Sequence, residues 1–365
     1  MQGVLFVWSI RSPGWMQDGR LGPWRSAFQR SNVGLRQLAA RSRDGRLRVG
    51  GMRFGLLCTA NVESSRAIRD YVELNVEAEA LGFVSTFLVE HHFSGWNQVA
   101  ATLMLQTCVA TRTSTLRLGT GVMVLPWHNP VLLAEQVATL DVLSDGRVDL
   151  GVGKGYRYSE FRGFGIDQRT ADARFAEALE LLLRAWTTRE RFSHHDRYWD
   201  FDDIVVEPPP CQSPYPPIWV AAASEASVRR GASCGHNLIL DQYASIEQIA
   251  ERIGWFGEGR EGQVAVARQV YVAHSRAEAD DALARHAAFT RRIIEVSRAP
   301  ESGDGSHVLR YANTEEHALF GTPDEIHDGL VALRSAGVDY VLVNLAGGTE
   351  QLRRFAHEVA TSPVL

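Results

Sequence analysis

The chain has 365 residues, a formal net charge of −5, and a composition that is 45% hydrophobic and 22% charged. These values are typical of an ordinary globular protein, and they lack the basic excess of a nucleic-acid-binding protein. No apolar run approaches the roughly 20 residues that span a bilayer, and the stretch 3–10 lacks the basic leader of a secretion signal. We therefore expect one large core, no nucleic-acid or membrane partner, and small-molecule chemistry.

The first 51 residues show no sustained hydrophobic period, whereas a clear strand pattern opens at Met52. We expect residues 1–51 to form a non-core extension and residues 52–365 to form one domain. A transit peptide is the rival interpretation, which Asp18 and Asp44 disfavour. The four cysteines have no C-x-x-C spacing and fall mostly in apolar segments, which favours reduced, buried thiols over disulfides or zinc and a cytoplasmic location.

Strand-like runs alternate with helix-period segments from residue 52 onward, and eight such pairs can be counted. The helix-period segments include Ser65 to Leu81 and Asp172 to Trp186. Eight alternating pairs predict an α/β fold, a closed (β/α)8 barrel of the TIM type. The strands are expected to begin at Arg53, Ser85, Leu116, Arg147, Ile218, Asn237, Val264 and Tyr340.

Glycine and proline positions agree with these elements. Gly82, Gly235 and Gly337 are placed to end helices, and Asn129-Pro130 and Thr322-Pro323 are typical helix starts. The proline-rich connection 189–217 is too rigid and irregular for a helix, and a second long connection runs over about 298–320. We therefore expect long insertions before strand five and before the last helix–strand pair, where barrels place substrate-covering loops.

Two neighbouring histidines follow the second predicted strand in the run Glu90-His91-His92. Successive residues on a strand point to opposite faces, so at most one imidazole can face the barrel mouth while the other packs or braces it. One catalytic and one supporting histidine are therefore expected at this strand end. An imidazole that is merely satisfied by backbone groups is the alternative.

The fourth strand ends in Gly151-Val152-Gly153-Lys154-Gly155, which fits neither the Rossmann nor the Walker spacing. Alternate glycines let the backbone approach a planar ligand, and Lys154 adds a cation at the carboxyl end of the strand, so an anion site is one interpretation. Glycines that serve barrel packing beside a solvated lysine are the other.

The fifth strand ends in small residues, Ala222 and Ala223, and Ser224 opens the next helix. A helix N-terminus attracts phosphate, although a plain N-cap by Ser224 explains the same residues. Arg174, early on the fourth helix, could reach the same region, but a lone helical arginine is usually a surface charge.

Aromatic side chains fall just beyond several strand ends and could surround the barrel mouth. They would form a pocket for an apolar or aromatic substrate, while core packing is the ordinary explanation for any one of them. The residues are Trp96, Trp127, His128, Tyr156 and Tyr158.

His194-His195-Asp196 lacks a third ligand at helical spacing and lies in a polar loop, so we expect a surface role and no metal. A metal hydrolase on the same fold would need paired ligands at other strand ends. Leu57-Cys58-Thr59-Ala60 after the first strand offers none.

Over about residues 52–361, the order and spacing of several short motifs resemble those of the bacterial luciferase-like, flavin-dependent monooxygenase family. No single motif is diagnostic. The motifs are Glu90-His91-His92-Phe93, Gly119-Thr120-Gly121-Val122-Met123-Val124-Leu125-Pro126, Asn129-Pro130, Leu140-Asp141-x-Leu143-Ser144-x-Gly146-Arg147, Phe161-Arg162-x-Phe164-Gly165 and Gly321-Thr322-Pro323-Asp324-Glu325.

The resemblance implies reduced FMN delivered by a separate flavin reductase, a flavin hydroperoxide formed with O2, and oxygenation of an organic substrate. It gives His91 the catalytic position, as base or hydrogen-bond donor, with His92 and Glu90 orienting or flanking it. An imidazole suits this role because its ordinary pKa near 6.5 lets it take and return a proton at cellular pH.

Further positions follow from the same resemblance. The flavin phosphate would meet Lys154, Arg174, Ser224 and Ser227, although barrels more often hold phosphate after strands seven and eight, where Gly347 and Gly348 are the runner-up. A non-proline cis peptide within Gly121-Val122-Met123 would lie beneath the isoalloxazine ring. The remaining residues expected to contact the cofactor are Gly153, Tyr156, Ala222 and Ala223, and those expected in the substrate pocket are Trp96, Trp127, Tyr158 and Glu160.

Departures from the family limit the resemblance. Luciferase proper has a cysteine, an arginine and an acid where this chain has Gly153, Lys154 and Ala223, which puts light emission and long-chain aldehyde specificity in doubt. Glu160 is expected near the ring, with a surface carboxylate as the alternative. A deazaflavin-dependent oxidoreductase and a non-catalytic flavin-binding partner subunit remain open, and pairing through helices two and three implies a homodimer.

Overall fold

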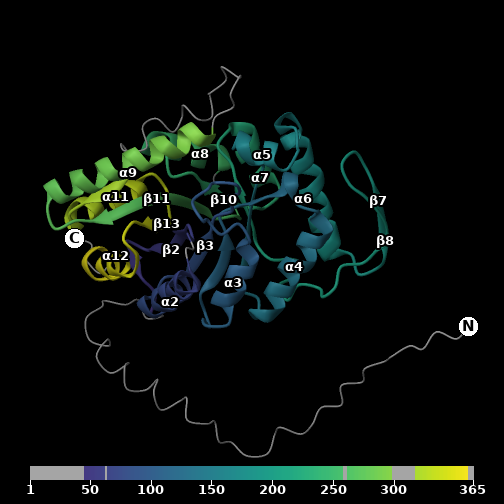
Figure 1. The fold of residues 1–365 in the computed structure, drawn as a ribbon, viewed down its shortest axis with the longest axis horizontal. Coiled ribbons are helices and arrows are strands. Elements are labelled where there is room, and N and C mark those ends of the chain that lie inside the picture. The colour runs from purple at the N-terminus through teal and green to yellow at the C-terminus, as the bar shows by residue number, and fades with distance from the viewer. Residues whose placement is uncertain (1–44, 62–63, 258–260, 298–316, 361–365) are drawn as a thin grey trace, which may run out of the picture. The chain divides into compact units, whose positions relative to one another are not determined.

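The computed structural model describes residues 45–61, 64–257, 261–297 and 317–360, all of which lie in one compact unit, Ala40–Leu365 (Figure 1). Eight parallel strands close into a barrel in the order β2-β13-β11-β10-β9-β6-β4-β3, and β3 pairs back to β2. The expected (β/α)8 barrel is confirmed. The barrel strands are β2 (Met52–Cys58), β3 (Ser85–Leu88), β4 (Arg117–Thr120), β6 (Val148–Gly153), β9 (Ile218–Ala221), β10 (Asn237–Leu240), β11 (Val264–Val272) and β13 (Tyr340–Leu345).

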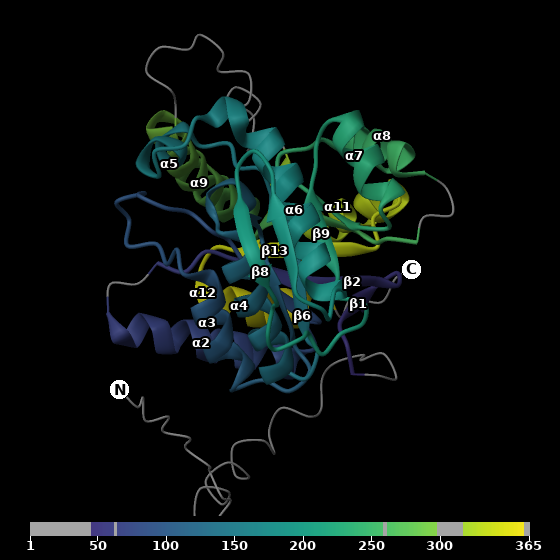
Figure 2. The same ribbon diagram turned by 90° about the vertical axis from the view of Figure 1, so that its right-hand side faces the viewer.

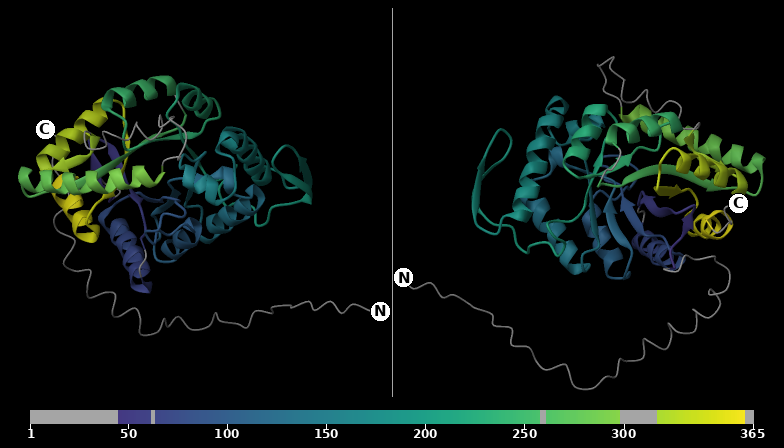
Figure 3. Two further views of the ribbon diagram at one scale, coloured as in Figure 1. Left: turned by 45° about the horizontal axis from the view of Figure 1, so that its top comes forward. Right: turned by 180° about the vertical axis from the view of Figure 1, so that it is seen from behind.

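Helices cover the outside of the barrel (Figures 1 and 3). They are α2 (Ser65–Leu81), α3 (Thr102–Ala110), η1 (Leu125–Trp127), α4 (Pro130–Leu143), α5 (Tyr158–Gly163), η2 (Gln168–Thr170), α6 (Ala171–Thr187), α7 (Glu225–Ser233), α8 (Ile246–Phe256), α9 (Arg276–Ser297), α11 (Pro323–Ser335), α12 (Gly348–Arg354) and η4 (Phe355–Val359). Within the described ranges, none of them combines the length and apolar composition needed to cross a membrane.

Local signals explain why these elements begin and end where they do. Asn129 caps α4 through Oδ1, which accepts from two backbone N–H groups, and proline occupies the first turn. Thr322 and Glu325 form a capping box at the start of α11. Gly82 ends α2 in the left-handed region, with φ 98°, where glycine carries no steric penalty.

Side chains fill the barrel interior, so the barrel is a packed core rather than a channel. The inner cluster comprises Phe87, Trp219, Ile239, Ala265, Tyr340 and Leu342. Phe87 and Trp219 meet edge to face at 5.8 Å between ring centroids. A Cβ on Gly119 would lie 2.4 Å from the Phe87 ring, so glycine is what admits this ring. Chemistry is therefore confined to the two ends of the barrel.

The described chain joins the barrel before the expected boundary at residues 51 and 52. Strand β1 (Arg48–Val49) pairs antiparallel with the first residues of β2, and Leu47 and Val49 are buried. The expected extension is therefore too long at its carboxyl end by a few residues, because a two-residue strand leaves no periodic pattern.

The insertion before β9 was expected to be irregular, and this is wrong in part. It contains an antiparallel hairpin, β7 (Phe192–His195) and β8 (Asp200–Ile204), which lies on the outer side of α6 (Figures 1 and 3). Most of the second expected insertion lies outside the described residues. Its end forms β12 (Leu319–Gly321), which pairs with β11, and the preceding helix α9 packs beside α5 (Figure 2).

A cavity of about 450 Å³ opens at the amino end of the barrel. Residues at or next to the start of every barrel strand line it, namely Arg53, Val84, Arg117, Asp149, Pro217, Asn237, Gln263 and Tyr340. This is the end opposite to the predicted catalytic residues.

Candidate active site

The carboxyl ends of four adjacent strands bring the predicted residues together. Gly121 N–H donates to Leu88 O at the end of β3, and the short strand β5 (Met123–Val124) pairs with Val152 and Gly153 at the end of β6. A Cβ on Gly153 would lie 2.6 Å from Val122 Cγ2 and 3.7 Å from Ala221 Cβ at the end of β9. The strand ends that follow β3, β4, β6 and β9 therefore share one region.

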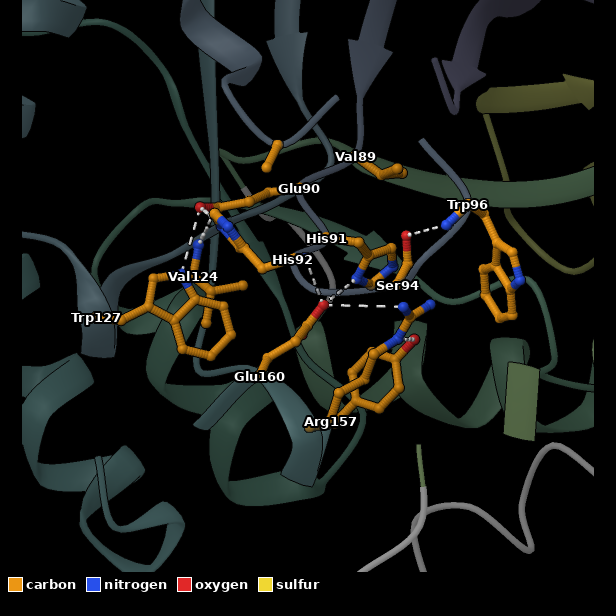
Figure 4. Close-up of polar contacts among 12 residues, drawn as sticks. Val89, Glu90, His91, His92, Ser94, Trp96, Val124, Trp127, Arg157 and Glu160 are labelled. Carbon is orange, nitrogen blue, oxygen red and sulfur yellow. Dashed lines mark hydrogen bonds and ion pairs between the residues drawn. The ribbon is translucent and has the colours of Figure 1, made fainter. Parts of the chain in front are cut away.

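Glu90 is a buried carboxylate that organises one side of this region (Figure 4). Its Oε1 accepts from His92 Nε2 at 2.8 Å, His128 Nε2 at 2.7 Å and Trp127 Nε1 at 3.3 Å, and its Oε2 accepts from Val124 N–H at 2.7 Å. Burial alone would raise the pKa of Glu90, but the bonds from His128, His92 and Val124 lower it to about 2. Glu90 is therefore ionised and holds the loops after β3 and β5 together.

The His91 side chain hydrogen-bonds to a different carboxylate, that of Glu160 on α5 (Figure 4). Its Nδ1 lies 3.0 Å from Glu160 Oε1, which also accepts the His92 backbone N–H at 2.9 Å. Burial lowers the pKa of His91; the hydrogen bond to Glu160 opposes this, and the charge of Arg157 lowers it further. His91 is therefore neutral at pH 7. Because a carboxylate only accepts, Nδ1 carries the proton and Nε2 is the acceptor.

This geometry bears on two expectations. Glu90 was expected to orient or flank His91, and its hydrogen bonds go to the His92 ring, His128, Trp127 and the Val124 N–H rather than to the His91 ring. Glu160 was expected near the flavin ring and in the substrate pocket, where it could tune protonation, with a surface carboxylate as the alternative. It is only 1% exposed and is bonded to His91 and His92, so the surface alternative is wrong. The two histidines therefore occupy separate carboxylate pairs, as expected from residues that point to opposite sides of a strand end.

The residues expected to meet the flavin phosphate lie on three elements around this region. Lys154 Nζ bonds Asp172 Oδ1 at 2.8 Å, which places it beside the first turn of α6, the helix that carries Arg174. Ser224 caps α7, and its Oγ lies 2.9 Å from Ser227 Oγ. The plain cap and the exposed lysine are both present, so the geometry is compatible with either interpretation of these residues.

Arg174 is not a free surface charge. Its guanidinium carbon lies 4.6 Å from the Tyr198 ring centroid and 5.7 Å from that of Trp199, and Nη1 donates to Pro126 O at 3.4 Å. Its Nε is buried and has no hydrogen-bond partner among the described residues. One donor of this arginine is therefore left for a ligand.

The cis peptide expected within Gly121-Val122-Met123 is present between Gly121 and Val122. Met123 and Ala222 are buried, and Ala223 is half-buried. The second phosphate candidate lies at the start of α12, where Gly347 and Gly348 both adopt positive φ.

The expected aromatic residues do not form one ring. Trp127 packs against the rings of Phe164, at 5.3 Å, and His92, at 5.9 Å. Trp96 instead meets Phe289 of α9 at 5.9 Å. Tyr158 is the first residue of α5 and is half-buried. Trp127 thus packs beside His92, whereas Trp96 packs against α9.

Tyr156 and Arg157, at the start of α5, lie on the His91 side. The Tyr156 ring meets the His91 ring edge to face at 6.2 Å, and Arg157 Nη1 lies 3.8 Å from Glu160 Oε1. Sequence reasoning missed Arg157, and also Tyr243 in the loop after β10. The position of Tyr243 just beyond a strand end was a usable signal; Arg157 gave none, because an arginine beside a helix start normally faces solvent.

His194 and its neighbours were expected to have a surface role without metal, and they lie beside a buried carboxylate. Ligand atoms of His194, Asp196 and Glu177 on α6 all lie within 4.8 Å of one another. Glu177 is buried, and its carboxylate already accepts the backbone N–H groups of Tyr198 and Trp199. This carboxylate therefore fastens the turn of the β7–β8 hairpin to α6.

Comparisons with known proteins identify relatives of this chain. A family model described as luciferase-like monooxygenase matches residues 52–340. The oxygenase component of the flavin-dependent trigonelline monooxygenase of Acinetobacter baylyi is 27% identical, over 74% of this chain and 81% of that protein. The F420-dependent glucose-6-phosphate dehydrogenase of Amycolatopsis mediterranei is 28% identical, over 51% of this chain and 57% of that protein.

A solved structure is similar over most of its length. The crystal structure of the monooxygenase RslO1 from Streptomyces bottropensis superposes with a TM-score of 0.73 and 25% sequence identity, over 84% of this chain and 98% of that one. The family match covers most of the described barrel, including the strand ends that carry His91, Lys154 and Ser224. The chain therefore belongs to the luciferase-like monooxygenase family and is, by that membership, an oxidoreductase.

Proposed function

We propose that this chain is the oxygenase component of a two-component monooxygenase. It would receive reduced FMN from a separate flavin reductase and use O2 to oxygenate a small apolar or aromatic molecule. The observation that carries the proposal is the neutral His91, held by the buried Glu160 beside the strand ends of β4, β6 and β9. A protein of this kind needs a base or hydrogen-bond donor at a flavin site. A neutral imidazole whose Nε2 has no partner among the described residues can act as the base, and it becomes a donor once Nε2 has taken the proton.

The donor set at the carboxyl end fits FMN. Lys154 and Arg174 supply two cations, and Ser224 and Ser227 supply hydroxyl groups, which together suit a phosphate dianion. The buried Arg174 Nε without a partner among the described residues supports a ligand at this place. The Lys154–Asp172 pair is largely exposed, so it contributes little stability and a phosphate can replace the carboxylate. Reduced FMN, when bound, supplies the electrons that activate O2.

The chain's own residues would control the proton. Glu160 fixes the His91 ring and keeps the proton on Nδ1, so that Nε2 can accept a proton and later return it. Glu90 fixes His92, and Trp127 and Phe164 pack over His92 and reduce the access of water from that side.

Further parts of the proposal concern the setting of the enzyme. The four cysteines are all free thiols, which supports a reducing, cytoplasmic location. They were expected to be buried, and this is wrong for Cys108, Cys211 and Cys234, which are exposed. A homodimer is proposed from the family relationship. A non-catalytic flavin-binding subunit is a weaker candidate, because His91, Lys154, Arg174 and Ser224 are all retained.

The cofactor can be tested with two reduced compounds. The full-length chain would be titrated without oxygen with reduced FMN and with reduced F420, and each complex would then be mixed with oxygenated buffer in a stopped-flow instrument. The proposal predicts tight binding of reduced FMN and an oxygen-dependent absorbance change distinct from that of free reduced FMN. Binding of reduced F420 alone, with no reaction with oxygen, would identify a deazaflavin-dependent oxidoreductase instead.

A further inference from the structure

Arg157 is a buried cation at the catalytic residues. Its side chain is only 8% exposed, and its head group lies on the side of Glu160 that faces His91 (Figure 4). A guanidinium has five N–H donors and is always charged, so burying one without acceptors is costly. The partners of Arg157 therefore need to be accounted for.

The described residues use few of these donors. Arg157 Nε donates to Tyr156 Oη at 3.4 Å, a long bond, and its guanidinium carbon lies 5.7 Å from the Tyr156 ring centroid. The nearest carboxylate oxygen, Glu160 Oε1, lies 3.8 Å from Nη1, which is an ion pair without a hydrogen bond. Within the described part of the chain, the Nη1 and Nη2 groups have no acceptor at hydrogen-bond distance.

The Glu160 oxygen that lies nearest to Arg157, Oε1, already accepts from His91 Nδ1 and from the His92 backbone N–H. Both contacts hold the catalytic histidine pair, and a shift of the carboxylate toward Arg157 would weaken them. The Nη1 and Nη2 groups of Arg157 are therefore available to a ligand that lies beside the His91 imidazole.

Beside the Glu160 carboxylate, two tyrosines lie near Arg157. Tyr156 lies against both Arg157 and His91. Tyr243 is half-buried nearby. Desolvation raises the pKa of its phenol, Tyr156 raises it further, and the charge of Arg157 acts in the opposite direction. The Tyr243 hydroxyl accepts from Gln242 Nε2 at 2.7 Å. An apolar or aromatic body next to an anionic group would be complementary to these walls.

We propose that Arg157 binds the carboxylate of the substrate, and that the substrate is a small carboxylic acid with an aromatic or apolar body. This deepens the proposed function and rests on it for the chemistry that follows binding. A carboxylate has two acceptor oxygens in the plane that the guanidinium fork presents, so it satisfies both Nη groups at once. The contact would hold the acid beside His91.

A carbonyl of the flavin is the other acceptor of this kind. It offers one oxygen and would leave part of the fork unsatisfied, and the cations proposed for the flavin phosphate, Lys154 and Arg174, are separate residues. The two sources can be distinguished by measuring acid binding and flavin binding separately in the same variants.

The experiment uses the full-length chain with benzoate and benzamide as probes, which differ in charge but hardly in shape. Binding would be measured by calorimetry in the wild type and in Arg157→Gln, Arg157→Lys and Arg162→Gln, after circular dichroism has established that each variant folds. Arg162 lies on the same helix but is exposed, which makes it the matched control. Reduced FMN affinity would be measured without oxygen in each.

We expect the wild type to bind benzoate more tightly than benzamide. Arg157→Gln should weaken benzoate binding about 10- to 100-fold and leave benzamide binding nearly unchanged, because a charged hydrogen-bonded pair is lost. Arg157→Lys should be intermediate, since it keeps the charge and loses the fork. Arg162→Gln should bind both probes as the wild type does. Reduced FMN affinity should change by no more than about twofold in any variant, because Arg157 is not expected to contact the flavin.

Three results would overturn the inference. These are no preference of the wild type for benzoate, equal benzoate affinity in Arg157→Gln, and a loss of FMN affinity without loss of benzoate affinity, which would assign the guanidinium to the flavin. If benzoate binding depends on Arg157 but reduced FMN does not bind the wild type, the carboxylate site stands and the proposed function fails.

Discussion

The two ends of the barrel carry similar polar and charged residues, which differ in how far their hydrogen-bonding groups have partners. At the amino end, Arg117 donates to both Asp149 oxygens, at 2.7 and 2.8 Å, and Glu79 accepts from the backbone N–H groups of the turn before β4. Arg53 donates to Gln263. At the carboxyl end, His91 Nε2 and the Nη groups of Arg157 have no such partner among the described residues.

This difference shows that the size of a cavity is a poor guide to function in this molecule. The amino end has the cavity of about 450 Å³, yet Arg117, Asp149 and Glu79 there all have hydrogen-bond partners. The carboxyl end holds the polar groups that a ligand could satisfy. Changes at the amino end should therefore act on stability, and changes at the carboxyl end on binding and turnover, as in other barrels of this kind.

The largest expected effect is at His91. His91→Ala should reduce substrate oxygenation about 10²- to 10⁴-fold, because a positioned proton-transfer group is lost, while reduced FMN still binds. Product formation would be measured against reduced FMN consumption. Full activity of the variant would show that His91 does not take part in proton transfer.

Glu90 should dominate the acid stability of the carboxyl end. Its pKa falls from 4.5 to about 2 on folding, which corresponds to about 3 kcal/mol at 1.36 kcal/mol per unit. A lowered pKa stabilises the fold above pH 4.5, and this stabilisation is lost as the pH falls from 4.5 toward 2.

Urea unfolding of the wild type and Glu90→Gln over this range would measure the effect. The difference between the two free energies of unfolding should be constant above about pH 5.5, roughly one unit above the ordinary pKa, and shrink toward low pH. A difference that does not change with pH would show that Glu90 is not the ionised partner of His92 and His128.

Asp149→Asn tests the amino end. The variant leaves Arg117 without its charged acceptor and should lower the free energy of unfolding by about 1.5–3 kcal/mol. Turnover and FMN affinity at a temperature well below the unfolding transition should equal those of the wild type. A specific loss of FMN binding in this variant would place a functional site at the amino end.

The smallest expected effects come from the N-cap residues of α7 and α11, and they distinguish a cap that also binds phosphate from a cap that does not. Ser224→Ala and Thr322→Ala each remove an N-cap bond and should each cost about 1 kcal/mol of stability. Only Ser224→Ala should also weaken FMN binding, because only Ser224 belongs to the proposed phosphate site. Equal FMN affinity in both variants would show that Ser224 caps α7 and does not bind the phosphate.

The fold could be predicted because its signals are local. The eight strands begin within one residue of the expected positions, and α2 has the expected bounds, since hydrophobic period and capping residues act over a few neighbours. The β7–β8 hairpin was missed because its strands are polar and largely exposed, which leaves no alternating pattern.

The candidate site could be predicted only in part. Strand ends place residues at the carboxyl end, so His91, Lys154 and Ser224 were accessible to sequence reasoning. The pairing of His91 with Glu160 joins residues 69 positions apart and depends on the direction of the short helix α5. No local pattern encodes that direction. For the same reason, Arg157 and the hydrogen bonds of Glu90 to His92 and His128 could not be predicted.

The most direct measurement is a crystal structure of the chain with FMN. We predict the phosphate against Lys154, Arg174 and Ser224, and the isoalloxazine ring at the carboxyl end in reach of His91. FMN bound in the amino-end cavity, or with its phosphate at Gly347 and Gly348 and its ring away from His91, would contradict the account.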